Sequence, residues 1–425
     1  MRLLSSLRCQ ASGSHDGVPD FVEVTGITAL HGKATMRRAR HSPAAMTSTA
    51  LDRLRAQARE ATLFTPTTLA NAVGRLGFVQ ADPIQAPARA QDLILRHRVS
   101  GYRAGDLDRS YRRLQLEEDF LYAYGFMPGE TRHLLHPRLD PEGEAGRHAP
   151  TGLAAEVLAF VRDHGPTHPR DLEARFGRER AVNGWGGFSK ATTRALDSLR
   201  HYGLLRVARR QDGIRIYEAV ALAVPVADAP ERARQLVLLI ARILNPVSAV
   251  SLRGALALMA RHNPGLGPLA PVVSAALKSG ELEQGEAGGE QYLWPAPEQG
   301  WQPGPAPGIV RLLAPFDPLV WDRRRFEHLW GWDYRFEAYT PPPQRRFGYY
   351  AMPMLWGDRV IGWANVAVTG GKMQVTTGYV RRCPDSQAFR RALDAELARM
   401  ERFLMARTAA RLGGRAGSGP GPWLG

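Results

Sequence analysis

The residues best suited to chemistry in this sequence are Gln80 and Asp82, which stand two apart in the stretch RLGFVQADPIQ. In an extended chain, residues two apart point to the same side, so an amide and a carboxylate could hold one water molecule between them. A carboxylate beside an N-glycosidic bond can steady an oxocarbenium-like sugar and activate that water. The pattern is common, however, and on these residues alone we favour a simpler interpretation, in which Asp82 opens a turn before Pro83.

Other catalytic signatures are absent from the sequence. It contains no H-E-x-x-H, Walker A, G-x-S-x-G or G-x-G-x-x-G motif, so zinc hydrolysis, nucleotide hydrolysis and triad chemistry have no support. Cys9 and Cys383 form no C-x-x-C pair and the 12 histidines do not cluster, so we expect no metal, no disulfide framework and no cofactor. Asp317 and Asp322 form a second candidate carboxylate pair, which we interpret as turn and ion-pair residues.

The net charge of the chain is +15, from 56 basic and 41 acidic residues. A basic balance of this size favours binding to the phosphate backbone of nucleic acid. All but four of the basic residues are arginine, which suits phosphate and guanine contacts but also fits a GC-rich genome with a basic proteome. Charge therefore permits DNA binding without establishing it.

Stretches rich in Pro, Gly or Ala divide the chain into the segments that must position these residues. We expect residues 1–46 to be a disordered or misannotated extension, since they lack the apolar core of a signal peptide, and Met46 is an alternative start. No stretch is long and apolar enough to span a membrane. These features suit a cytoplasmic, nucleoid-associated protein. The predicted segments are 47–140, 151–222, 231–294 and 309–409, followed by a disordered tail, 413–425.

Segment 151–222 has the clearest plan. Apolar residues at helical spacing predict three helices, the second capped by Thr167 or His168 and the third by Ser189. Two alternating stretches around Gln-Asp-Gly then predict a hairpin. Three helices followed by a β-hairpin is the order of a winged helix, whose third helix normally enters the DNA major groove. Segment 231–294 repeats this order, and segment 47–140 begins in the same way but lacks an obvious long wing.

Residues 309–409 change character. The stretches IVRLLAPFDPLVW, FEAYTPPPQRRFGYYAMPMLW, RVIGWANVAV and KMQVTTGYV predict strands, and an amphipathic helix follows at 385–409. The predicted fold is therefore α+β, with tandem winged-helix domains followed by a small antiparallel β-barrel or sheet domain and a C-terminal helix.

Three stretches carry a resemblance to a known family. They are the Gln-x-Asp triplet with its following residues, Phe126-Met127-Pro128, and the long block from APFDPLVWDRRR to YRFEAYTPPPQRRFGYYAMPMLWGDRVIG. Over residues 50–405 the sequence resembles the YcaQ-like DNA glycosylases, which include the azinomycin-resistance enzymes and unhook interstrand crosslinks. The resemblance implies that Asp82 is the general base or charge stabiliser and that Gln80 positions the water. It also implies tandem winged helices and a C-terminal barrel around a basic DNA channel.

The sequence departs from the family pattern just before Phe126. Where relatives close to YcaQ carry His and Glu, this chain has Tyr122 and Ala123. Two polar groups are therefore missing near the expected site. This departure keeps a second hypothesis open, a non-enzymatic winged-helix DNA-binding protein such as a regulator or architectural factor. Gln85, Tyr122 and Tyr124 are candidate pocket residues.

We expect a monofunctional DNA glycosylase that acts on bulky alkylated purines in double-stranded DNA, crosslinked purines included. Alkylation at N7 or N3 gives the purine a positive charge and makes it a good leaving group, so a carboxylate and a placed water suffice. We expect a monomer with no obligate protein partner and no membrane association. The candidate DNA contacts, each of which could equally be a solvated surface charge, are Arg89, Lys190, Arg194, Arg323, Arg324, Arg345 and Arg346.

Overall fold

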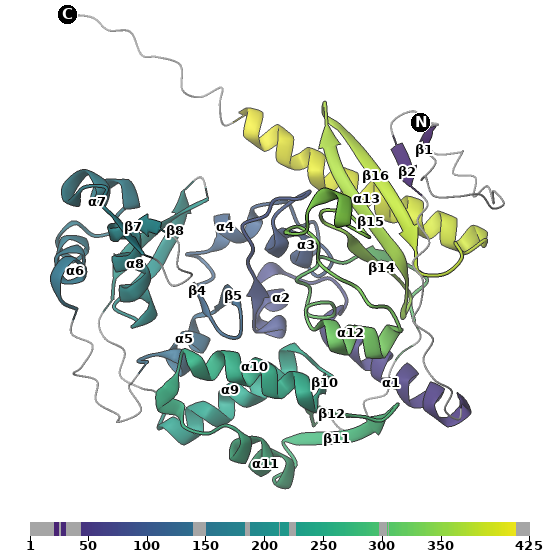
Figure 1. Ribbon diagram of the computed structural model, residues 1–425, viewed down its shortest axis with the longest axis horizontal. Helices are drawn as coiled ribbons and strands as arrows, with labels where there is room; N and C mark the ends of the chain where they lie inside the picture. The colour runs from purple at the N-terminus through teal and green to yellow at the C-terminus, as the bar shows by residue number, and fades with distance from the viewer. Residues whose placement is uncertain are drawn as a thin grey trace, which may run out of the picture.

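The computed structural model describes residues 21–24, 27–30, 44–138, 150–182, 188–211, 213–220, 227–296, 304 and 306–413 (Figure 1). The predicted extension and tail lie largely outside these residues; within the extension, strands β1 (Phe21–Val24) and β2 (Ile27–Leu30) pair antiparallel. The described residues form α-helices and small antiparallel sheets, which confirms a mixed helical and antiparallel class.

The first segment combines helices with a three-stranded antiparallel sheet of order β3-β5-β4. Helix α2 (Leu69–Leu76) begins where the Thr68 hydroxyl accepts a hydrogen bond from the Asn71 amide. It ends at Gly77, whose φ of 69° suits glycine. The other elements are α1 (Ala44–Thr62), β3 (Val79–Gln80), α3 (Ala90–Leu95), α4 (Asp106–Ser110), β4 (Leu116–Phe120), β5 (Tyr124–Pro128) and α5 (Gly129–Leu135).

The second segment follows the predicted order of three helices and a hairpin. His168 caps its second helix and forms a capping box with Asp171. Lys190, and not Ser189, stands at the N-cap of its third helix, because strand pairing continues through Lys190, opposite Arg180, and the helix begins at Ala191. The elements are α6 (Gly152–His164), α7 (Pro169–Phe176), β6 (Arg180–Val182), β7 (Phe188–Lys190), α8 (Ala191–His201), β8 (Leu205–Gln211) and β9 (Ile214–Ala219).

The third segment repeats helices followed by a hairpin. The hairpin turns at Gly288 and Gly289, whose φ angles of 60° and 78° belong to the left-handed region. A short strand before the second helix joins the hairpin in a sheet of order β10-β12-β11. The elements are α9 (Ala229–Ile243), β10 (Val247–Ser248), α10 (Ala249–Arg261), η2 (Pro264–Leu266), α11 (Ala270–Lys278), β11 (Leu282–Ala287) and β12 (Glu290–Pro295).

The C-terminal segment is an open antiparallel sheet of order β13-β14-β15-β16. Among the described residues its edge strands, β13 and β16, do not pair with each other, so the barrel alternative of the prediction is wrong and the sheet alternative is correct. Helix α13 packs against β13. The elements are β13 (Val310–Leu312), α12 (Arg323–Trp330), η3 (Pro342–Gln344), β14 (Met352–Trp356), β15 (Arg359–Thr369), β16 (Lys372–Tyr379) and α13 (Gln387–Gly413).

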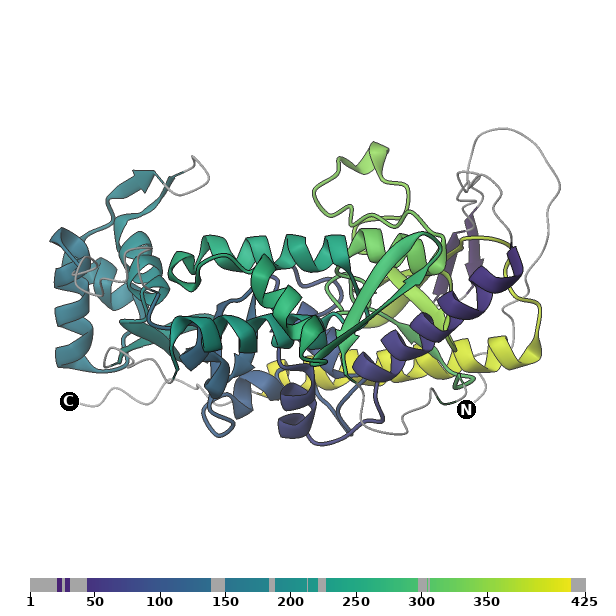
Figure 2. The same ribbon diagram turned by 90° about the horizontal axis from the view of Figure 1, so that it is seen from below.

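Residues 336–351, predicted as the start of a strand, form a loop that contains η3 and stands out from the body in Figure 2. Three successive prolines cannot donate backbone hydrogen bonds to a neighbouring strand. The buried Glu337 carboxylate holds the loop instead. It accepts hydrogen bonds from the amides of Arg346, Phe347 and Gly348 at 3.0, 2.7 and 3.2 Å.

Figures 1 and 2 show helices α6 to α8 at one end of an elongated molecule and the C-terminal sheet toward the other. Buried ion pairs join the first segment to the C-terminal one. The Arg98 guanidinium donates to both carboxylate oxygens of Asp317 at 2.8 and 2.9 Å, and neither side chain is exposed. Arg96 pairs with the buried Glu396 of α13. Asp317 is an ion-pair residue, as interpreted from the sequence. Asp322 also has a structural role, since its carboxylate accepts a hydrogen bond from the Arg325 amide and caps α12.

We expect Arg98→Ala to lower the free energy of unfolding by about 3–5 kcal/mol, because Asp317 would be left as a buried charge without its partner. Equilibrium unfolding in urea measures the change. Arg390→Ala is the matched control. Arg390 pairs with Asp385 at the surface, where side chains are 49% and 73% exposed, so its loss should cost under about 1 kcal/mol. Equal losses in the two variants would contradict the assignment.

Candidate active site

Gln80 ends strand β3, which lies at one edge of the first sheet. Strand β3 pairs antiparallel with β5, with Gln80 opposite Gly125, and the Ala81 amide then donates to the Tyr124 carbonyl at 3.0 Å. A Cβ atom at position 125 would lie 2.5 Å from the Phe78 ring, so glycine permits this close approach of the two strands. The β4–β5 hairpin thus fixes where the chain leaves β3 and enters the Gln-x-Asp motif.

Asp82 is half-buried directly after this strand. Its Oδ1 accepts a hydrogen bond from the Ile84 amide at 2.8 Å, so the carboxylate does open a turn, as the simpler interpretation requires. Burial raises the pKa of Asp82, and the Ile84 hydrogen bond offsets part of that rise. The turn uses one carboxylate oxygen, and the half-exposed carboxylate keeps a second oxygen for chemistry.

The Gln80 side chain carries a buried amide oxygen with no hydrogen-bond partner among the described residues. Buried polar atoms are normally paired with protein or water, and an exception calls for a functional or solvent explanation. A water molecule between this amide and Asp82 would satisfy both groups. This is the arrangement that the spacing of the two residues predicts.

Tyr350, which lies just before β14, is a residue that sequence reasoning did not assign to the site. It is 3% exposed, and its hydroxyl has no hydrogen-bond partner among the described residues. Burial raises the pKa of Tyr350 well above its ordinary value, and the negative charge of Asp82 adds to the rise. Tyr350 lies far from Asp82 along the chain, so the spacing of residues carried no signal that would have selected it.

The departure at Tyr122 is accommodated by packing. Tyr122 is 3% exposed, with its ring centroid 5.1 Å from that of Phe78 and 4.6 Å from that of Trp321. Burial raises the pKa of its hydroxyl. Its ring fills space between the first and C-terminal segments, as an aromatic core residue does.

Tyr124 and Gln85, the other candidate pocket residues, have different surroundings. The Tyr124 hydroxyl donates to Glu118 at 2.8 Å, and the Arg215 guanidinium stacks 4.4 Å from the centre of its ring. Gln85 is exposed in the loop after Asp82. The structure therefore brings the backbone of Tyr124 to the motif, while its side chain belongs to an ionic network.

That network rests on three successive buried acids of β4, Glu117, Glu118 and Asp119. Each pairs with an arginine of the second segment. The closest contacts are Arg206 to Glu117 at 3.0 Å, Arg210 to Glu118 at 2.5 Å and Arg200 to Asp119 at 2.9 Å. Sequence reasoning missed this set, although acids flanked by Leu116 and Phe120 in a strand are a signal of buried charge. The network fastens the β8–β9 hairpin to the strands that hold Gln80.

Comparison with known proteins places this chain in a family. The model of the family described as DNA glycosylase AlkZ-like matches residues 73–403. The chain belongs to the AlkZ-like DNA glycosylase family. The match includes Gln80, Asp82 and Tyr350, and it confirms the resemblance found in the sequence. No solved structure matches the chain.

DNA is the substrate partner of an AlkZ-like glycosylase, so the exposure of the candidate DNA contacts matters. Arg194, Arg324 and Arg346 are exposed, although Arg324 pairs with Glu290 at 2.7 Å and Arg346 with Asp333 at 3.7 Å. Lys190 pairs with Glu173 at 2.5 Å. The three arginines present positive charge at the surface. A surface ion pair is weak, so its basic side chain can leave the carboxylate and bind a phosphate instead.

Three other candidates are engaged by the protein. Arg89 pairs with Asp108 and also lies against the β8–β9 turn, where a Cβ on Gly213 would approach it to 2.7 Å. Arg323 is half-buried and donates to the carbonyls of Pro315 and Val320. Arg345 is partly buried, donates to the Thr340 carbonyl at 2.8 Å and stacks on Tyr349. Arg323 therefore stabilises the backbone of the loop between β13 and α12, which contains both carbonyls.

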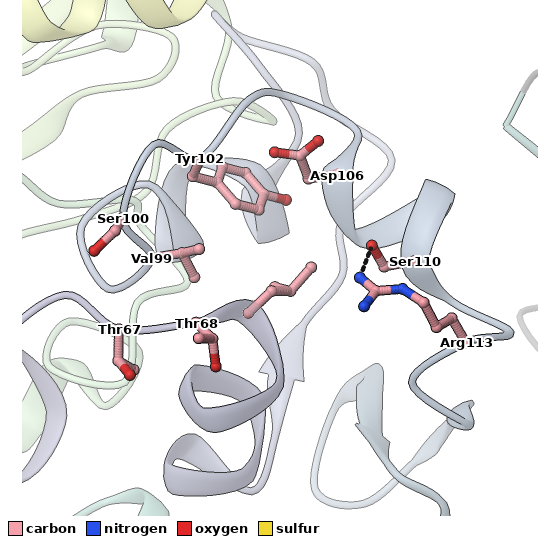
Figure 3. Close-up of a pocket in the computed structure, with 9 residues that line it drawn as sticks. Thr67, Thr68, Val99, Ser100, Tyr102, Asp106, Ser110 and Arg113 are labelled. Carbon is pink, nitrogen blue, oxygen red and sulfur yellow. Dashed lines mark hydrogen bonds between the residues drawn. The ribbon is translucent and has the colours of Figure 1, made fainter.

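A separate pocket of about 510 Å³ opens at the N-terminal end of α2 (Figure 3). Its polar lining is mainly hydroxyl groups, with Arg113 bonded to Ser110 at 3.2 Å. Gln80 and Asp82 follow the C-terminal end of the same helix, about 12 Å away along its axis at 1.5 Å per residue. The pocket is therefore distinct from the candidate site.

Two further observations concern function. Among the described residues, no group of three or more His, Cys, Asp or Glu side chains could hold a metal ion. Nor does any described helix combine the length and apolar character needed to cross a membrane.

We expect Asp119→Asn to lower the free energy of unfolding at pH 7 by about 3 kcal/mol, since buried arginines would lose their counter-charge. Burial raises the pKa of Asp119, but Arg138, His136 and Arg200 outweigh burial and hold it below the ordinary value. A depressed pKa contributes stability that is present above about pH 4 and is lost as the pH falls further. Urea unfolding across pH should show the difference between variant and wild type narrowing below pH 4. Asp163→Asn, at an exposed position, should differ little from wild type at any pH.

Proposed function

We propose that this AlkZ-like protein is a monofunctional DNA glycosylase that hydrolyses the N-glycosidic bond of bulky alkylated purines, including those in interstrand crosslinks. The observation that carries the proposal is a half-buried Asp82 two residues after Gln80, whose buried amide oxygen has no hydrogen-bond partner among the described residues. Both residues lie in the part of the chain that matches the family. An N7- or N3-alkylated purine is cationic and leaves readily, so this small device is sufficient chemistry.

In the proposed reaction Gln80 orients a water molecule and Asp82 accepts one of its protons. The water oxygen forms a bond to C1′ of the sugar as the bond from C1′ to the purine nitrogen breaks. The electron pair of that bond returns to the purine and neutralises its positive charge. Before the water attacks, the Asp82 carboxylate steadies the oxocarbenium-like sugar electrostatically.

We further propose that segments 47–140, 151–222 and 231–294 are winged-helix units that bind double-stranded DNA and that the protein acts as a monomer. The order of helices and hairpin in the second and third segments supports this assignment. Arg194 lies exposed on α8, the third helix of its segment, and Arg346 lies exposed on the loop beside Tyr350. Both are available to phosphates.

A non-enzymatic DNA-binding protein is the second candidate. It is favoured by the core position of Tyr122, which occupies one of the two places where relatives close to YcaQ carry polar groups. The two candidates differ in one measurable property, since only a glycosylase releases the modified base.

We expect Asp82→Asn to reduce excision of N7-alkylguanine from duplex DNA by about 10²–10⁴-fold, because the carboxylate that receives the proton is replaced by an amide. Single-turnover gel assays with a single adduct and with a crosslinked duplex measure the rate, and a binding titration on the same DNA is the control. If the wild type binds both duplexes but excises from neither, the DNA-binding alternative is correct.

The rate of excision should fall as the pH decreases, because Asp82 must be ionised to accept a proton. Burial raises its pKa, so we expect the acid limb of the pH profile above the ordinary aspartate value of about 4. Single-turnover rates between pH 4 and 8 test this. A rate that is flat through this range would exclude Asp82 as the titrating base.

A further inference from the structure

The Glu118 carboxylate of β4 is the point where the second segment meets the strands that hold the motif. Its side chain has no exposed surface. Arg210 of the β8–β9 hairpin donates to it through Nε and Nη2 at 2.8 and 2.5 Å, and the Tyr124 hydroxyl donates to it at 2.8 Å. Arg215 of the same hairpin lies 3.5 Å away. One buried carboxylate is therefore bonded both to the hairpin and to strand β5.

Tyr124 is also the residue of β5 that holds the motif. Its carbonyl accepts a hydrogen bond from the Ala81 amide at 3.0 Å, and the next residue of β5 pairs with Gln80. Ala81 stands between Gln80 and Asp82, the two residues that the proposed reaction uses. The contacts thus form an unbroken path from the hairpin, through Glu118 and Tyr124, to the backbone of the motif.

The hairpin also contacts the chain beyond the motif. Arg89 is the N-cap residue of α3, where the loop that follows Asp82 ends. A Cβ atom on Gly213, in the hairpin turn, would lie 2.7 Å from the Arg89 guanidinium, so the turn lies directly against that side chain. The hairpin therefore meets the structure that precedes the motif loop and the residue at its end.

The arginines of the hairpin pair with the acids of β4. Arg206 pairs with Glu117 at 3.0 Å, while Arg210 and Arg215 both pair with Glu118. Arginines on a hairpin could instead bind phosphate. Transfer of Arg210 to a phosphate would, however, remove a partner from a carboxylate that is fully buried, and such a loss is strongly destabilising. These contacts favour a role in holding the motif over a role in binding DNA.

We propose that Glu118 is a positioning residue of the glycosylase site, and that it sets the geometry of the Gln-x-Asp motif only while the β8–β9 hairpin is docked on it. This inference rests on the proposed function. The second segment then has two separate roles, since α8 binds DNA and the hairpin holds the motif. A misplacement of reacting groups by about 1 Å can slow a reaction about 10²-fold, so loss of this link should lower the rate of excision and not the DNA affinity.

Tyr124→Phe is the direct test, because it removes the hydroxyl that links β5 to Glu118 and keeps the ring that stacks on Arg215. In single-turnover excision of N7-alkylguanine, we expect the rate constant to fall about ten- to a hundredfold while the Kd for the DNA is unchanged. With protein in saturating excess, the rate constant does not depend on the folded fraction, so a loss of stability alone would not lower it. Hydrogen exchange at the Ala81 amide should become faster, since its acceptor is less firmly held.

Glu118→Gln tests the docking of the hairpin. The amide oxygen can still accept from Tyr124, but the charge that pairs with Arg210 and Arg215 is lost. We expect excision to slow at least as much as in Tyr124→Phe, and the double variant to add little, because both changes break the same path. Tyr124→Phe leaves every charge in place, so it decides the question if Glu118→Gln fails to fold.

Tyr102→Phe is the matched control. The Tyr102 hydroxyl also donates to a buried carboxylate at 2.8 Å, but that carboxylate belongs to Asp92 in α3 and not to the sheet of the motif. This variant should excise like the wild type, and exchange at Ala81 should be unchanged.

The outcomes separate this inference from the proposed function. If Asp82→Asn abolishes excision but Tyr124→Phe keeps the wild-type rate constant, or slows no more than Tyr102→Phe, the inference is wrong and the proposed function stands. Weaker DNA binding at an unchanged rate constant would place the network on the DNA-binding surface and would also overturn the inference. A wild type that excises nothing overturns the proposed function and this inference together.

Discussion

The buried ion pair between Arg98 and Asp317 is the constraint on which the candidate site depends. Neither side chain is exposed, and both carboxylate oxygens are bonded to the guanidinium. In a low-dielectric interior such a pair tolerates little displacement, because either charge without the other is strongly destabilising. It holds the loop after β13 against the first segment, and Phe316, the residue before Asp317, begins the aromatic packing that leads to Tyr350.

A second set of buried ion pairs, formed by the acids of β4, holds the sheet from which the motif emerges. The strand that carries these acids pairs with β5, and β5 pairs with β3. Arginines of α8, β8 and β9 close onto the acids from the second segment. Buried ion pairs thus stabilise two regions of the protein around the Gln-x-Asp motif, the loop after β13 and the β4 strand. The surface of the same protein must also attract phosphate.

Local patterns in the sequence predicted much of the fold. Periodicity and turn residues located the helices and hairpins of the second and third segments, because those signals lie within a few residues of one another. The predicted barrel was wrong because closure of a sheet depends on pairing between edge strands that are distant in the sequence. The predicted strand at FEAYTPPPQ was wrong because its prolines prevent strand pairing. Gln80 and Asp82 could be selected by spacing and resemblance. Tyr350, Glu118 and Asp317 could not, because their roles arise from contacts between residues far apart in the chain.

The position of Asp317 in the sequence has a consequence for biosynthesis. Arg98 also donates to the carbonyls of Thr62 and Ile94, so it is built into the interior of the first segment. Its counter-charge is translated much later than the rest of that interior. Until Asp317 has been translated, Arg98 therefore lacks the carboxylate that it pairs with in the complete structure. The native packing of the first segment is completed only when the C-terminal sheet has been synthesised, and a truncated product would keep the motif but not the structure around it.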